Sequence, residues 1–115
     1  MTRGMAKQKD VLKKIVALKR QGAEQRLLIL QTEAERIEAA IRQMRAGLAT
    51  MDNTTAGFDA LWLAEQNGHV RKVISDINAA QAALAMKQTE VSEAREALKR
   101  AFHSENRLGE ITAKG

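Results

Sequence analysis

Non-polar residues recur at alternating steps of three and four in two long stretches of the chain. The first stretch ends at Met51 and the second begins at Val70. This spacing is typical of positions a and d of a coiled-coil heptad, which lie along one side of a helix. The predicted seam comprises Lys13, Val16, Arg20, Ala23, Leu27, Leu30, Ala34, Ile37, Ile41, Met44, Leu48 and Met51, and then Val70, Val73, Ile77, Ala80, Leu84, Lys87, Val91, Ala94, Leu98, Ala101, Glu105 and Leu108.

A polar cluster at residues 52–57 separates the two stretches and contains candidate helix N-caps. Asn67 and Gly68 predict a further helix stop, because glycine readily adopts the left-handed conformation that ends helices. We therefore expect a first arm over residues 5–51, a tip over 52–68 with a short helix at 57–66, and a second arm over 69–112.

The two seams match in length and step order when the chain folds so that Met51 faces Val70. Leu30 then faces Val91, Leu27 faces Ala94 and Ile37 faces Leu84. Two unrelated helices would have no reason to carry such matched seams. The pattern predicts an all-α fold in which residues 1–115 form one antiparallel two-helix coiled-coil hairpin with a short helical tip segment.

A second apolar stripe begins near the N-terminus, where the seam contains the charged residues Lys13 and Arg20. It consists of Val11, Ile15, Leu18 and Gly22, again at heptad spacing, and Phe102 lies beside the seam of the second arm. One interpretation is a phase slip of the coiled coil. The other is a third surface, apolar with a basic border, that is offered to another protein.

Composition narrows the class of protein. The 115 residues include no Pro, no Cys, 7 Gly and 3% aromatic residues. Without Cys there is no disulfide scaffold or thiolate metal site, and few aromatic residues and turns argue against a β-sandwich. The 44% of hydrophobic residues is largely Ala. Long helices with a thin core fit these numbers.

Positive charge is concentrated at the N-terminus. The formal net charge of the chain is +5, but the first 20 residues carry seven of the 19 Lys and Arg residues and a single acidic residue, Asp10. These cations are Arg3, Lys7, Lys9, Lys13, Lys14, Lys19 and Arg20. A basic end of this kind suits an acidic partner.

Catalytic chemistry is not expected. No glycine-rich phosphate-binding motif occurs, and His103 has no second metal ligand three or four residues away. A two-helix hairpin also lacks a pocket that excludes water. We expect no enzyme activity, no catalytic residues, no cofactor and no metal. The longest strongly apolar run, residues 27–30, is too short for a membrane span, and a cytoplasmic location is expected.

Nucleic-acid binding is disfavoured despite the basic character of the chain, because aromatic platforms for single strands are absent. A basic leucine zipper is disfavoured as well, since residues 52–57 interrupt the helix. A helix over residues 5–20 that lies on a membrane surface would lack an aromatic anchor.

Two of the three aromatic residues lie in the expected tip, which contains Phe58, Leu61 and Trp62. The tip either folds back and buries Trp62 against Met51 and Val70, or presents Trp62 as an exposed anchor for a partner.

Several segments resemble a known family. The start of the chain contains VLKKIVALKRQ at residues 11–21 and AEQ at residues 23–25. The first arm continues with EAERIEAA at residues 33–40, and the second arm contains REALKR at residues 95–100 and ENRLGEI at residues 105–111. This pattern resembles the FliJ/YscO-like proteins, the small coiled-coil stalk proteins of flagellar and virulence type III export systems.

The resemblance implies a non-enzymatic stalk or adaptor whose paired termini enter the hexameric export ATPase. The implied partners are that ATPase, the export gate protein and export chaperones, with membrane contact only through the export apparatus. The expected partner-binding residues are Lys13, Lys14, Ile15, Leu18, Lys19, Arg20, Phe102 and Arg107. The alternatives are an unrelated structural coiled-coil scaffold and a basic nucleic-acid-binding hairpin, and the oligomeric state stays open.

Overall fold

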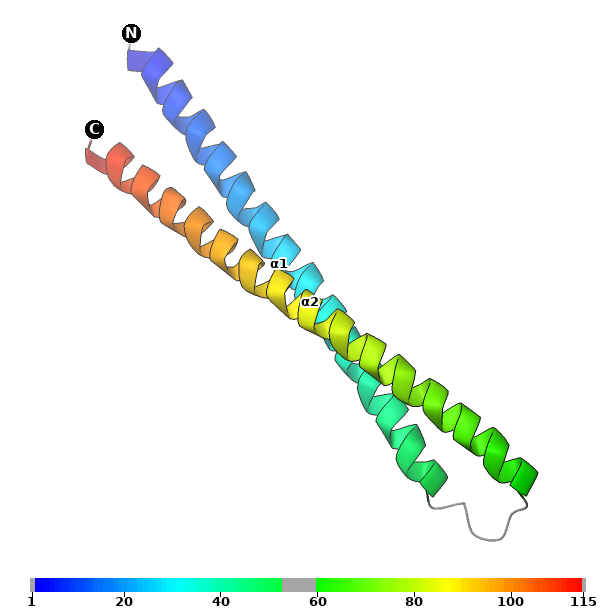
Figure 1. Cartoon of the computed structure of the whole chain (residues 1–115). Coiled ribbons are helices and arrows are strands. Elements are labelled where there is room, and N and C mark those ends of the chain that lie inside the picture. Colours follow the sequence, from blue (N-terminus) through cyan, green and yellow to red (C-terminus); the bar gives the residue numbers. More distant parts are fainter. Residues whose placement is uncertain (1, 53–59, 115) are drawn as a thin grey trace. The chain divides into compact units, whose positions relative to one another are not determined.

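The computed structural model describes residues 2–52 and 60–114, and all of them are helical (Figure 1). Helix α1 spans Thr2–Asp52 and helix α2 spans Ala60–Lys114. Both helices are rich in Ala, Leu, Gln, Glu, Lys and Arg, which have high helix propensity. The absence of Pro leaves their backbone hydrogen bonding uninterrupted.

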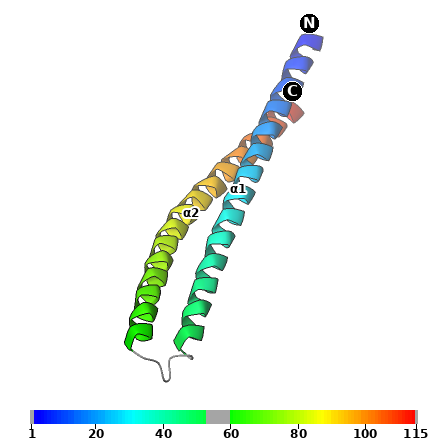
Figure 2. The same ribbon diagram turned by 90° about the vertical axis from the view of Figure 1, so that its right-hand side faces the viewer.

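The chain divides into two compact units, and each unit contains one segment of each helix. The terminal unit combines Met1–Gln31 with Thr89–Gly115, and the middle unit comprises Thr32–Gln88. Within each unit the segments of α1 and α2 run in opposite directions, as both Figure 1 and Figure 2 show. The fold is therefore all-α, an antiparallel helical hairpin of the coiled-coil type, as the matched seams predict.

The core of the terminal unit forms where the two helices meet at seam positions. Leu30, Val91 and Ala94 are buried in one cluster, and Leu27 packs against it. These four residues are the predicted pairs Leu30–Val91 and Leu27–Ala94. The pairing inferred from the spacing is thereby confirmed in this unit.

Among the described side chains of the middle unit, Ala34, Ile41 and Ile77 are buried, and all three are predicted seam positions. Lys87 also occupies a seam position, and its Nζ lies 2.8 Å from Oε2 of Glu33 on α1. The long stem of Lys87 lies at the seam while its ammonium group meets the carboxylate at the edge. This ion pair joins the two helices at the predicted level.

The predicted seam is confirmed along almost its whole length. Every seam residue from Val16 to Met51 and from Val70 to Leu108 is buried or half-buried, and only Lys13 is exposed. The core is thin, because no described side chain is fully removed from solvent. A pair of helices without a third layer has one narrow strip to bury, which explains this outcome.

The helix stop predicted at Asn67 and Gly68 is wrong. Helix α2 begins at Ala60 and runs through both residues, so the second arm does not start at residue 69 and the expected tip helix at 57–66 is not a separate element over its described part. The backbone of Gly68 is not left-handed. Because a glycine inside a helix costs only about 1 kcal/mol relative to alanine, helical neighbours on both sides outweigh it.

Candidate partner-binding surface

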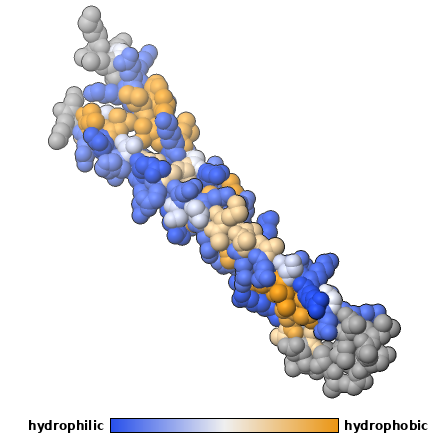
Figure 3. Space-filling view, viewed as in Figure 1, coloured by the Kyte–Doolittle hydropathy of each residue, from blue (hydrophilic) through white to orange (hydrophobic). Residues whose placement is uncertain are grey.

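The second apolar stripe of α1 is exposed in the terminal unit. The exposed fractions are 54% for Val11, 44% for Ile15 and 65% for Leu18. Over the same turns Val16, Arg20 and Ala23 stay half-buried at the seam. The coiled coil therefore keeps its phase here and does not slip onto the second stripe. Figure 3 shows hydrophobic residues reaching the visible surface of the terminal unit beside hydrophilic ones.

Two of the predicted cations, Lys14 and Lys19, flank this stripe on α1, whereas Lys13 lies at the seam and lines the groove between the helices. Lys13, Lys14 and Lys19 are all exposed. None of them forms an ion pair with another described residue. An apolar stripe bordered by unpaired ammonium groups provides both non-polar area and positive charge to a partner. Arg107 on α2 is likewise exposed.

Arg20 forms two ion pairs inside the terminal unit. Its Nε donates a hydrogen bond to Oε2 of Glu105 on α2 at 2.6 Å, and its Nη1 donates one to Oε1 of Glu24 at 2.8 Å. Hydrogen bonding to Glu105, then to Glu24, raises the pKa of Arg20 above its ordinary value. Because its pKa is raised in the folded protein, Arg20 stays charged at neutral pH. Its contribution to folding stability is fully present below the ordinary pKa of arginine and is lost only as the pH rises through the raised pKa.

Phe102 belongs to the same layer as Arg20. The guanidinium carbon of Arg20 lies 5.7 Å from the centroid of the Phe102 ring, within the range of a cation–π contact. The ring is still 42% exposed. Arg20 and Phe102 therefore form an interhelical contact at the seam, whereas Ile15 and Leu18 lie on another face of α1.

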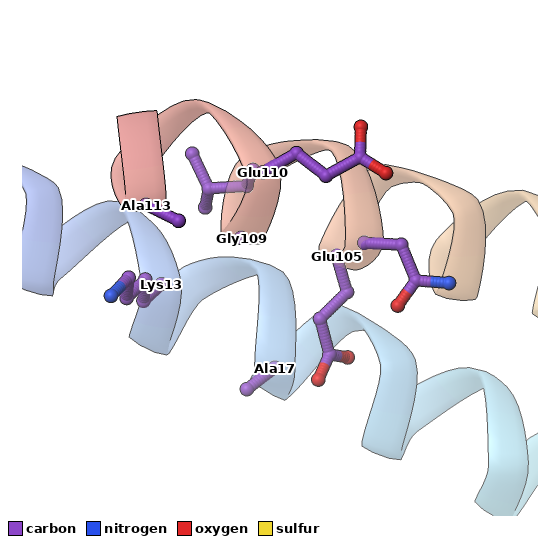
Figure 4. Close-up of a pocket in the computed structure, with 8 residues that line it drawn as sticks. Lys13, Ala17, Glu105, Gly109, Glu110 and Ala113 are labelled. Atoms are coloured by element: carbon purple, nitrogen blue, oxygen red, sulfur yellow. The ribbon is translucent and has the colours of Figure 1, made fainter. Parts of the chain in front are cut away.

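A groove opens between the two helices beyond this layer, towards the termini. It has a volume of about 730 Å³ and is lined by Lys13 and Ala17 of α1 and by Glu105, Asn106, Leu108, Gly109, Glu110 and Ala113 of α2. Figure 4 shows the side chain of Glu105 extending towards α1 beside Ala17, and that of Glu110 pointing away from it. Small residues on both helices, with exposed Lys13 in place of a core residue, explain why the seam is open here.

The structure describes only part of the expected tip segment. Phe58 lies outside the described residues. Leu61 and Trp62 belong to α2, but their side chains are not among those described. The two interpretations of Trp62 therefore stand as they did from the sequence.

Sequence reasoning ended the exposed stripe too early. Ile29 is 56% exposed and lies seven residues after Gly22, so it continues the spacing of Val11, Ile15 and Leu18. The heptad spacing that includes Ile29 is visible in the sequence, but Gly22 and Gln25 interrupt the run of apolar residues between Leu18 and Ile29.

Two further observations concern the described part of the chain. No group of three or more His, Asp or Glu side chains within it is placed to hold a metal ion. Neither helix, over its described residues, includes a segment long and apolar enough to cross a membrane.

Comparisons of the chain with protein families, with curated proteins and with solved structures found no match.

Proposed function

We propose that this protein is a non-enzymatic stalk or adaptor of a type III protein export system in the cytoplasm. Its paired helix termini engage the hexameric export ATPase and connect it with the export gate and export chaperones. The observation that carries the proposal is the surface of the terminal unit, where exposed Val11, Ile15 and Leu18 lie beside exposed Lys14 and Lys19, and where exposed Lys13 lies on the same turns at the seam.

Two features support this function over a purely structural coiled coil. A structural pair of helices buries its apolar residues against its partner helix, whereas α1 leaves Val11, Leu12, Ile15 and Leu18 exposed near its N-terminus. The same turns contain the densest positive charge of the chain. Both features favour a partner with an apolar, acidic surface, which suits the acidic loops expected in the pore of an export ATPase.

The test is a pull-down of the export ATPase from the same organism with the purified protein. Wild type is expected to retain the ATPase, and the variant Lys13→Glu/Lys14→Glu/Lys19→Glu is expected to lose at least about 90% of it, because three repulsive charges replace three attractive ones. The matched control is Arg36→Glu/Arg71→Glu/Lys72→Glu, which makes the same change in charge at exposed positions of the middle unit.

Circular dichroism establishes that each variant keeps its helical content. Equal retention of the ATPase by wild type and by the Lys13 triple variant would remove the role assigned to the basic end. Salt-sensitive binding of wild type to DNA, with no binding to the ATPase, would replace the proposal with a nucleic-acid-binding hairpin.

A further inference from the structure

The exposed face of α1 is a complete second heptad series. Counting from Val11 in steps of four and three gives Ile15, Leu18, Gly22, Gln25 and Ile29. The four large apolar members are each at least 44% exposed, and all six positions lie in the terminal unit. We call these six residues the outer stripe. Heptad spacing over this length is the pattern that accepts another helix lengthwise.

The outer stripe faces away from α2. At about 100° per residue, its centre lies roughly 150° around α1 from the seam positions Val16, Ala23 and Leu27. Those seam residues are half-buried in the terminal unit, whereas the outer stripe is exposed. Helix α2 therefore cannot cover the outer stripe while it packs on the seam.

Positive charge borders the outer stripe on both sides. In its heptad frame, the flanking positions e and g are occupied by four exposed cations and by Leu12, Gln21 and Leu28, with no acidic residue. The cations are Lys7, Lys14, Lys19 and Arg26. Side chains at e and g select the partner of a coiled coil through ion pairs across the interface. Glu24 lies elsewhere on the helix and is paired with Arg20.

We infer that the outer stripe binds an acidic amphipathic helix of a partner protein, with apolar residues at its own a and d positions and Asp or Glu at e and g. The bound helix adds a third strand to the coiled coil on the side of α1 opposite to α2. This inference extends the proposed function by naming the secondary structure and the charge of the segment that binds. It rests on the proposed function only for the identity of the protein that contains this helix.

Charge excludes a second copy of this chain as the occupant. Two outer stripes packed together would oppose four cations with four cations in either direction, without an acidic residue at the border. The narrow width of the stripe argues against a membrane surface. Gly22 and Gln25 interrupt it, and no aromatic residue lies in it, whereas helices that lie on membranes present a broad apolar face with aromatic anchors.

The experiment uses a designed fluorescent peptide of about three heptads, with Ile at a, Leu at d and Glu at e and g, so that it repels itself. A control peptide has Lys in place of every Glu. Fluorescence anisotropy is measured while the full chain is added at about 100 mM salt. The acidic peptide is expected to bind at least about tenfold more tightly than the basic one.

Two variants assign the binding to the outer stripe. Lys19→Glu/Arg26→Glu reverses part of the border and is expected to shift the preference towards the basic peptide by about tenfold or more. Arg42→Glu/Arg45→Glu makes the same change in charge at exposed positions of the middle unit and keeps the preference. Ile15→Gln/Leu18→Gln weakens binding of the acidic peptide about tenfold while helicity is unchanged.

Equal affinity for both peptides, or no shift in Lys19→Glu/Arg26→Glu, overturns the inference. The inference is also overturned if the protein binds vesicles of phosphatidylcholine and phosphatidylglycerol more tightly than the acidic peptide and loses this binding in Ile15→Gln/Leu18→Gln. The outer stripe would then bind a membrane surface. A dimer in sedimentation that dissociates on the same substitution assigns the stripe to a second copy. The peptide experiment contains no ATPase, so binding of the acidic peptide would support this inference even if the pull-down of the ATPase failed. Conversely, a successful pull-down without peptide binding would support the proposed function and overturn this inference.

Discussion

Charged residues occupy the seam at Arg20 and Lys87, and each is neutralised by a carboxylate on the opposite helix. Arg20 pairs with Glu105 in the terminal unit at 2.6 Å, and Lys87 pairs with Glu33 in the middle unit at 2.8 Å. A charged residue at a core position of a coiled coil lowers stability but disfavours registers in which its partner is displaced. These pairs favour the observed pairing of the helices over a shift by one heptad.

Stability at the residue scale depends on a few seam residues. We predict that Leu30→Ala lowers the free energy of unfolding by about 2–3 kcal/mol, the lower part of the usual range for such changes, because the cavity left in a two-helix seam is close to solvent. Leu30 is only 4% exposed and belongs to the cluster with Val91 and Ala94. Urea unfolding followed by circular dichroism measures the change.

Leu18→Ala is the matched control, since it removes the same atoms from a side chain that is 65% exposed. Its unfolding free energy is expected to stay within about 0.5 kcal/mol of wild type. If Leu18→Ala destabilised the protein as much as Leu30→Ala, the outer stripe would be part of the core of the folded chain.

At the scale of the element, both helices continue through glycines without a change of backbone conformation. Gly22, Gly47, Gly68 and Gly109 all lie inside α1 or α2, and a Cβ atom added at any of them would meet no atom within 4 Å. Glycine at such positions weakens a helix because the unfolded chain has more backbone freedom to lose. Both helices therefore form despite these residues, through the rest of their composition and their packing.

Gly68→Ala is predicted to stabilise the protein by about 0.5–1 kcal/mol, because alanine favours the helical backbone and space is free for its methyl group. Thermal unfolding followed by circular dichroism is the measurement, with Gly47→Ala as a second helical site expected to behave alike. A lower melting temperature for Gly68→Ala alone would indicate a left-handed Gly68 and restore the helix stop expected from the sequence.

At the scale of the whole molecule, one rule of pairing operates in both units. The cluster around Leu30 in the terminal unit and the contact of Lys87 with Glu33 in the middle unit both agree with the antiparallel alignment of Met51 with Val70. The net charge of +5 is a property of the N-terminal turns rather than of the molecule at large. The N-terminal turns of α1, where the seam residue Lys13 is exposed, are also the turns with the densest positive charge.

A disulfide tests this alignment within a single chain. The chain has no Cys, so Ile37→Cys/Leu84→Cys introduces only one possible pair. Oxidation of dilute protein is expected to give a cross-linked monomer on non-reducing electrophoresis, because facing seam positions lie within reach of a disulfide. Ile37→Cys/Ile77→Cys, displaced by one heptad, is the control and should stay reduced. A cross-linked dimer, or cross-linking of the control pair alone, would contradict the alignment.

Much of this protein was determined by the sequence alone, because heptad spacing is a local property that decides which side of a helix is apolar. The seam and the antiparallel alignment both followed from the spacing. The spacing also revealed a second stripe, but periodicity does not say which of two stripes the partner helix covers.

Only the tertiary structure decided that question, because the face that stays uncovered depends on where α2 packs. It placed α2 on the seam, which left the outer stripe exposed as far as Ile29. It also directed Arg20 towards Glu105 and Phe102 of α2, since the contacts of a long side chain depend on the neighbouring helix. And it kept Asn67 and Gly68 helical, because the propensity of two residues is small beside the cooperativity of a long helix.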